Sequence, residues 1–168
     1  MGEVDELEDR LINLRVAIDE FEDDWRRMHS EWDDLGNIEA VEDELIPLVI
    51  STYAAIEDIT THVLIAYVIK DSVSNSAFDY IYSDMSQSHR EQFLIRCNIL
   101  SRQTRGNIGE FRALRNKIAH GTSERLDWYR DDIPKRMNLA FEVLNQFTVA
   151  FTDPDRIDEL VNNEDAKL

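Results

Sequence analysis

The chain has 168 residues, of which 43% are hydrophobic, so it can bury the core of one ordinary domain but not of two full ones. The longest runs without a charged residue, 45–56 and 59–69, are shorter than the ~20 residues that a membrane-spanning helix needs. The acidic first residues do not resemble a secretion signal. We therefore expect a cytoplasmic protein without a membrane segment. The formal net charge of −17 by itself disfavours binding to nucleic-acid phosphates.

Acidic residues are spread unevenly along the chain. Residues 1–84 carry 22 acidic and 5 basic side chains, residues 85–136 carry 6 and 11, and residues 137–168 carry 7 and 2. The middle segment is thus net positive and favours an anionic ligand there. Asp exceeds Glu and Arg exceeds Lys, a bias that suits solubility in concentrated salt. We hypothesise a halophilic source; the alternative is an acidic face that docks a basic partner, and stability measured against KCl concentration separates the two.

Hydrophobic periodicity predicts an all-α protein, an up-and-down bundle of four to five helices. The first predicted helix covers residues 3–33, and its apolar residues are spaced three and four apart without a break. This stripe is made of Val4, Leu7, Leu11, Leu14, Ile18, Phe21, Trp25, Met28 and Trp32. So narrow a stripe suits a coiled-coil seam between chains and packing along the chain's own second helix equally well. We therefore divide the chain into a long heptad helix at 1–36, a helical bundle at 37–153 and an acidic tail at 154–168.

The second predicted helix covers residues 39–70 and is apolar on nearly all sides, so it should form the centre of the core. Pro47 is expected to bend or restart it in its first turns. His62 lies in this apolar run with no metal-ligating residue three or four positions after it. A hydrogen-bonded core histidine is therefore expected there, and not a metal ligand. A short helical piece should follow at about 77–83.

The third predicted helix runs from Ser86 or Ser88 to about Arg102, and its apolar side is Phe93, Leu94, Cys97 and Leu100, with Cys97 as a small core residue. The fourth is expected to begin after Asn107, which acts as the N-cap, and to end at Gly121 as a C-terminal cap. A last long helix should cover about 131–151.

The fourth predicted helix carries the side chains best suited to chemistry. Its end reads Arg-Asn-Lys-Ile-Ala-His-Gly over 115–121. The guanidinium of Arg115 can bind a phosphate through two hydrogen bonds, and the imidazole of His120 can take and give a proton near neutral pH. At 100° per residue, Arg112, Asn116 and His120 share the solvent side, whereas Arg115 lies beside the apolar stripe with its stem partly covered.

The segment from Arg115 to His120 resembles the Arg-x4-6-His motif, with a polar residue after the arginine, of the HEPN superfamily of small α-helical bundles. Residues 111–114 and Gly121 are similar to the usual surroundings of that motif. The resemblance covers about 39–151 and leaves the heptad helix outside. Toxin members that pair with a nucleotidyltransferase often carry a tyrosine two residues after the histidine, and here Thr122 departs from that pattern.

The resemblance implies a metal-independent endoribonuclease without a cofactor, acting as a homodimer in which two motifs meet across the interface. Arg115 would hold the scissile phosphate of RNA, Asn116 would orient it or the imidazole, and His120 would act as general acid or base. Attack by the ribose 2′-hydroxyl would leave a 2′,3′-cyclic phosphate. The implied setting is a toxin–antitoxin or defence system. Four further cations are RNA-binding candidates: Arg105, Arg112, Lys117 and Arg125.

A non-catalytic function is the alternative. The chain would then be a helical interaction module that binds a protein or RNA partner, for example an antitoxin held by residues 1–36, and the motif would serve as an interface network and helix cap. Arg115 and His120 also point about 140° apart on one helix, so one copy cannot easily grip one phosphate with both. The nuclease hypothesis therefore requires a dimer.

Overall fold

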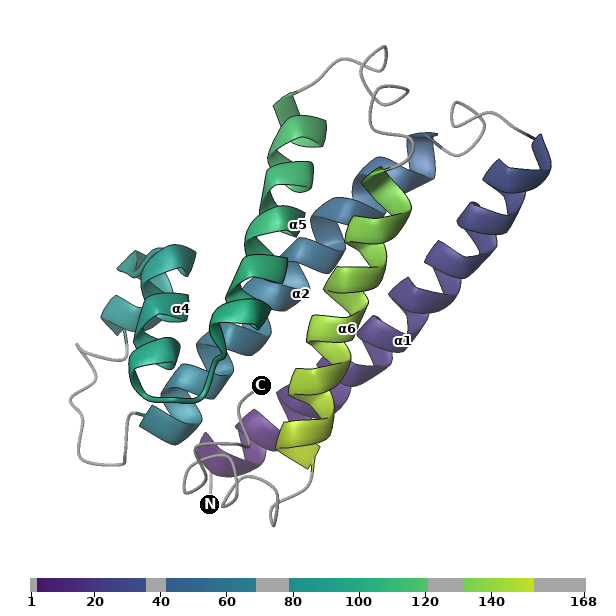
Figure 1. The fold of residues 1–168 in the computed structure, drawn as a ribbon. Helices are drawn as coiled ribbons and strands as arrows, with labels where there is room; N and C mark the ends of the chain where they lie inside the picture. The colour runs from purple at the N-terminus through teal and green to yellow at the C-terminus, as the bar shows by residue number, and fades with distance from the viewer. Residues whose placement is uncertain (1–2, 36–41, 69–78, 121–131, 153–168) are drawn as a thin grey trace.

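The computed structural model describes residues 3–35, 42–68, 79–120 and 132–152, and within these ranges it contains helices and no strand. In chain order the elements are α1 (Glu3–Leu35), α2 (Glu42–Val68), a π-helical turn η2 (Tyr80–Asp84), α4 (Gln87–Arg96), α5 (Arg102–His120) and α6 (Asp132–Thr152). The long helices α1 and α5 run in one direction, and α2 and α6 run in the opposite one (Figure 1). The predicted all-α, up-and-down bundle is confirmed.

Helix α2 is the centre of this bundle, as its nearly all-round apolar sequence predicts. It packs against α1, α4, α5, α6 and η2, and Leu45, Val49 and Ile56 are completely buried. The helix continues through Pro47, so the expected restart does not occur. Pro47 is exposed and lies in the second turn, where the hydrogen bond that its ring removes falls close to the helix start. Because α2 contacts every other described helix, its side chains reach both faces of the bundle.

Helix α1 packs against α2 and α6 of its own chain. Over its described side chains the predicted apolar stripe faces the core: Ile18, Trp25, Met28 and Trp32 are buried, and Leu14 and Phe21 are partly buried against them. Outside the core, Arg27 Nη2 donates to Glu44 Oε2 of α2 at 2.6 Å. From Leu14 to Trp32 the stripe therefore packs within the chain. The side chains of Val4, Leu7 and Leu11 lie outside the described ones.

The boundary between α4 and α5 differs from the prediction. Helix α4 ends at Arg96, and Asn98 adopts a left-handed conformation with φ 59°. The amide of Asn98 donates to Ile95 O and that of Ile99 to Leu94 O, at 3.0 and 2.9 Å, which is the Schellman arrangement of a helix C-terminus. The predicted continuation of this helix to Arg102 is therefore wrong, because asparagine tolerates the left-handed turn that stops it.

Helix α5 accordingly begins six residues earlier than predicted, at Arg102. Ser101 Oγ accepts a hydrogen bond from the amide of Thr104 at 3.0 Å, so Ser101 and not Asn107 is the N-cap. Asn107 lies inside the helix and bonds Gln103 at 3.1 Å. The described part of α5 ends at His120, and the predicted Gly121 cap lies outside the described residues. The early start adds a full turn that brings Arg105 onto the same helix as the motif.

The buried side of α4 agrees only in part with the predicted apolar side of Phe93, Leu94, Cys97 and Leu100: Leu94 and Leu100 are buried, but polar residues of α4 are buried as well. Gln87, Glu91 and Leu94 are its buried residues, whereas Phe93 is 44% exposed and Cys97 is exposed. The prediction of Cys97 as a core residue is therefore wrong. Its chain position after the last turn of α4 places it in the capping turn, on the solvent side. What α4 brings to the bundle is a carboxylate, that of Glu91.

One stretch of α2, Asp43–Ile65, is long and apolar enough to cross a membrane as judged by length and composition, but most of it is buried inside the bundle. A core helix of a soluble protein has the same properties. The burial of this stretch follows from its five neighbouring elements.

Candidate functional site

The motif end of α5, which we define as Arg115, Asn116 and His120, lies on the last two turns of that helix. Helix α4 flanks the first half of α5, so these turns project beyond it (Figure 1). Asn116 and His120 are exposed and Arg115 is half-buried. Arg115 Nη1 donates to Asn116 Oδ1 at 3.0 Å, and its guanidinium carbon lies 5.2 Å from the centre of the Tyr53 ring. The stem of Arg115 is thus partly covered, as predicted.

Arg112 does not lie on the solvent side with Asn116 and His120, as the helical wheel predicts. It is directed between α2 and α4, where its Nε donates to Tyr53 Oη at 2.8 Å and its Nη2 pairs with Glu91 Oε1. The Glu91 side chain is 1% exposed and also lies 3.8 Å from Arg105 Nε. We call Tyr53, Glu91, Arg105 and Arg112 the Glu91 cluster.

Electrostatics in the Glu91 cluster follow from burial and pairing. Burial raises the pKa of Tyr53 above its ordinary value, although the hydrogen bond and charge of Arg112 act in the opposite direction. Burial by itself lowers the pKa of Arg112, but the hydrogen bonds to Glu91 and Tyr53 outweigh it, and that pKa is raised. At neutral pH the cluster therefore holds a neutral tyrosine between charged groups.

The four predicted RNA-binding cations differ in whether they pair with a carboxylate and in whether they are exposed. Arg105 and Arg112 share the single carboxylate of Glu91, which pairs closely with Arg112 and lies 3.8 Å from Arg105 Nε, so it compensates Arg112 and only partly compensates Arg105. Lys117 is exposed on α5. Arg125 lies outside the described residues. Only part of the predicted set therefore faces a ligand at the motif end.

Other arginines and lysines of the positive segment can be sorted in the same way. Lys135 and Arg136 pair with acidic side chains, at 3.8 and 3.5 Å, and Arg90 donates to the carbonyl of Ile81 at 3.3 Å. Among the described residues, Arg96, Arg102 and Arg115 of this segment make no ion pair with a carboxylate. Arg115 alone of these three belongs to the motif end, where it bonds the amide oxygen of Asn116 at 3.0 Å. It is the cation best placed to bind an anion.

Sequence reasoning missed two residues of this region, Tyr53 and Glu91. Tyr53 sits in the apolar run of α2 and reads as an ordinary core residue. Glu91 carries a signal that can be recognised, because it is the only acidic residue between Asp84 and Glu110. A lone carboxylate inside a basic segment predicts an internal counter-ion.

His62 is a core histidine, as predicted. It is 4% exposed, and its Nδ1 lies 2.7 Å from the carbonyl oxygen of Asp58, so Nδ1 carries the proton in this contact. Nε2 is buried without a hydrogen-bond partner. His62 lines a cavity of about 360 Å³ together with Asn13, Leu14, Asp58 and Tyr82. That cavity shares Leu14, Asp58 and Tyr82 with a larger one of about 520 Å³ between α1 and α2.

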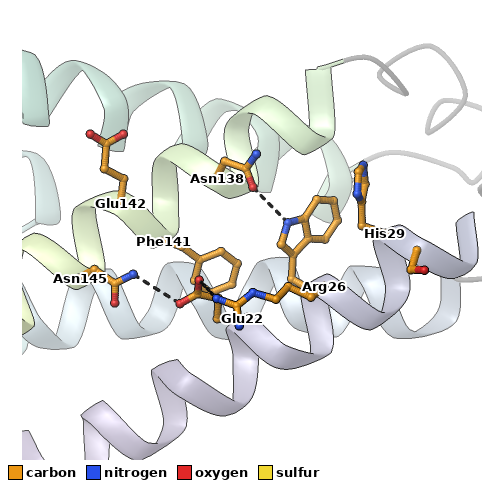
Figure 2. Close-up of a pocket in the computed structure, with 9 residues that line it drawn as sticks. Glu22, Arg26, His29, Asn138, Phe141, Glu142 and Asn145 are labelled. Carbon is orange, nitrogen blue, oxygen red and sulfur yellow. Dashed lines mark hydrogen bonds and ion pairs between the residues drawn. The ribbon is translucent and has the colours of Figure 1, made fainter. Parts of the chain in front are cut away.

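A third pocket, of about 660 Å³, lies between α1 and α6 (Figure 2). Trp25 Nε1 donates to Asn138 Oδ1 at 3.3 Å, and Asn145 Nδ2 donates to Glu22 Oε2 at 3.4 Å. The carboxylate of Glu22 also pairs with Arg26 at 2.6 Å. Since these polar groups bond to one another across the two helices, we assign the pocket a structural role in fixing α1 to α6.

Within the described ranges, no three side chains among His, Cys, Asp and Glu gather as metal ligands do. Comparisons with family models, with curated proteins and with solved structures give no match to this chain. Among the described residues, the motif end of α5 combines a cation without a carboxylate partner, an amide and an exposed imidazole.

Proposed function

We propose that the chain is a metal-independent endoribonuclease of the HEPN type that acts as a homodimer. The observation that carries this proposal is the state of the motif end: Arg115 makes no ion pair with a described carboxylate, and Asn116 and His120 beside it are exposed. By contrast, Arg112, one turn earlier, is neutralised by Glu91. An arginine kept without a counter-ion, on the same two turns of a helix as an exposed imidazole, is suited to a phosphodiester once a second copy brings the two groups together.

In the proposed reaction, Arg115 binds the scissile phosphate and stabilises the charge that builds up on its oxygens. His120 transfers protons while the ribose 2′-hydroxyl attacks the phosphorus and the 5′-oxygen leaves. The products are a 2′,3′-cyclic phosphate and a 5′-hydroxyl. Asn116, already bonded to Arg115, orients the guanidinium or the phosphate. The reaction needs no metal and no cofactor.

A second copy is part of the proposal, because one helix directs Arg115 and His120 apart. One side of α5 supports close approach of another helix. Its small and polar residues are spaced three and four apart: Gly106, Gly109, Ala113, Asn116 and His120. A Cβ atom at Gly106 or Gly109 would meet no atom within 4 Å, so the chain itself does not require glycine there. We call these five residues the α5 seam and place the dimer contact along it.

Cleavage of RNA in EDTA tests the proposed function. The purified protein in high KCl is incubated with structured and single-stranded RNA, beside Arg115→Ala and His120→Ala. We expect cleavage by the wild type and a loss of about 100-fold or more in each variant, with products ending in 2′,3′-cyclic phosphate.

Lys135→Ala is the matched control, because it removes one positive charge from the same segment at a residue that already pairs with Glu110. It should cleave like the wild type. Equal survival of RNA with wild type and motif variants would contradict the proposal. So would cleavage that depends on added Mg²⁺.

Cellular placement follows from the proposal. A ribonuclease of this kind acts on RNA in the cytoplasm, within a toxin–antitoxin or defence system. In that setting the acidic helix α1, which is fixed on the bundle by its own core residues, offers the surface for a protein partner.

An interaction module without catalysis is the second candidate function. One observation favours it: on α1, Ile12 and Val16 are 60% and 53% exposed and lie one turn apart on the same side. Apolar residues on an otherwise acidic helix face suit a partner helix. In that case Ile12→Asp with Val16→Asp would abolish partner binding, and Arg115→Ala would leave it unchanged.

A further inference from the structure

Tyr53 of α2 is contacted by two arginines of α5 in different ways. Its hydroxyl accepts a hydrogen bond from Arg112 Nε at 2.8 Å, and the face of its ring lies 5.2 Å from the guanidinium carbon of Arg115. Arg112 and Arg115 are three residues apart and so neighbour each other on one side of α5. The single ring of Tyr53 therefore contacts both Arg112, which pairs with Glu91, and Arg115, which has no described carboxylate partner.

The position of this ring is fixed at both ends. At the hydroxyl end, Arg112 is itself held by the carboxylate of Glu91, which is 1% exposed. At the other side the ring packs against Phe111, with ring centres 6.4 Å apart. Tyr53 is 3% exposed, so the ring has little room to turn. A rotation would break a charge-assisted hydrogen-bond chain, which costs more than a neutral one.

A fixed aromatic face has a defined effect on a guanidinium. Stacking attracts the cation through the ring quadrupole, while the N–H donors of the guanidinium lie at its edge and stay available. A carboxylate at the same place would occupy those donors. Tyr53 therefore holds Arg115 in place without using the groups that bind a phosphate.

We propose that Tyr53 is a positioning residue for Arg115, which it holds through its ring face without occupying any N–H donor of the guanidinium, and that Glu91 and Arg112 fix Tyr53 for this purpose. The proposal rests on the proposed function in one respect, that the anion bound by Arg115 is an RNA phosphate. What the proposal adds is an energetic coupling between Tyr53 and Arg115 in the binding of that anion.

A double-mutant cycle on binding tests this coupling apart from catalysis. The probe is a fluorescent single-stranded oligonucleotide of 2′-O-methyl RNA, which lacks the attacking hydroxyl and cannot be cleaved by the proposed reaction. Affinity is measured in EDTA at one KCl concentration for wild type, Tyr53→Leu, Arg115→Ala and the double variant. We expect Tyr53→Leu to weaken binding about fivefold and the double variant to bind like Arg115→Ala alone.

Tyr53→Phe keeps the ring and removes the anchored hydroxyl, so its affinity for the probe should fall about twofold. This variant serves as the test if the leucine variant unfolds. Tyr80→Leu, an exposed tyrosine of η2, is the matched control and should bind normally. A purely structural role for Tyr53 would lower the affinity equally with and without Arg115, and that outcome would overturn the proposal. Absence of any Arg115-dependent binding would overturn it as well.

Nuclear magnetic resonance gives a readout without any ligand. The guanidinium carbon of Arg115 lies 5.2 Å from the centre of the Tyr53 ring, so the side-chain proton resonances of Arg115 should be shifted by the ring current in wild type and Tyr53→Phe but not in Tyr53→Leu. Unshifted resonances in wild type would contradict the stacking. Failure of the proposed nuclease is seen separately, as a protein that binds the probe through Arg115 and Tyr53 yet leaves cleavable RNA intact.

Discussion

The Glu91 cluster and the motif end are each built on an arginine of α5, and these two arginines, Arg112 and Arg115, lie on neighbouring turns of that helix. Arg112 is directed inward between α2 and α4, where it meets a carboxylate that is 1% exposed. Arg115, one turn later, lies on the Tyr53 ring and contacts no described carboxylate. The difference shows that a single buried acidic residue, Glu91, pairs with one of two neighbouring arginines and leaves the other without a described carboxylate partner.

The two regions also differ in how far water can solvate their polar groups. A charge inside the bundle needs a partner of opposite sign, because desolvation is costly. At the motif end, Asn116 and His120 are exposed, and water can solvate their polar groups until a ligand arrives. Hence removing a partner should damage folding in the first region and function in the second.

Exchanging the two arginines for alanine tests this contrast most strongly. Arg112→Ala leaves the Glu91 carboxylate with Arg105 alone, at 3.8 Å, so we expect the free energy of unfolding to fall by about 3 kcal/mol. Arg115→Ala removes a partly exposed cation–π contact and should cost less than about 1 kcal/mol. Urea unfolding of both variants at the same KCl concentration measures the two values.

The double variant Glu91→Leu with Arg112→Met should recover much of the loss, because a well-packed apolar pair of similar volume avoids the desolvation of two charges. Equal destabilisation by Arg112→Ala and Arg115→Ala would remove the distinction between the two regions.

Much of the framework of these regions could be predicted from the sequence. The spacing of apolar residues indicates the long helices, and the all-round apolar run of α2 marks it as the centre. The predicted apolar stripe of α1 includes Trp25 and Trp32, and both are buried. Sequence alone does not say whether the partner helix of this stripe lies in the same chain. These features depend on local periodicity, which a sequence displays directly.

The direction of Arg112 could not be predicted in this way. A helical wheel places a residue relative to its own axis, but the side that α4 covers depends on where the chain turns back. That turn is set by the left-handed Asn98 and by the cap at Ser101, neither of which changes the hydrophobic pattern. The Glu91 cluster therefore arises from tertiary packing, and only the isolation of Glu91 in a basic segment hints at it.

Glycines of the α5 seam offer a smaller test on the exposed side of the comparison. Gly109→Ala places a methyl group where it meets no atom within 4 Å and improves helix propensity, so we expect the monomer to gain about 0.5–1 kcal/mol. If the seam is the dimer contact, the same methyl group should weaken self-association. Urea unfolding and analytical ultracentrifugation measure the two effects.

Ala119→Gly is the matched control, since it lies on α5 about 60° or more away from the seam residues and is also exposed. It should lower stability and leave the association state unchanged. A Gly109→Ala protein that is more stable and still fully dimeric would place the dimer contact elsewhere.

Alkaline pH provides the smallest test, and it acts on the residue that joins the two regions. Because burial raises the pKa of Tyr53, the folded chain holds the phenolic proton more firmly than the unfolded chain does. The stability from this difference is fully present below the unfolded pKa of about 10 and is lost as the pH rises through the raised folded value. As the pH rises above about 10, the wild type should therefore lose more unfolding free energy than Tyr53→Phe, whose phenylalanine does not titrate. Ile50→Val, a change without a titrating group in the same helix, should run parallel to the wild type. Parallel curves for wild type and Tyr53→Phe would mean that the hydroxyl is not held in the buried, Arg112-bonded position from which Arg115 is oriented.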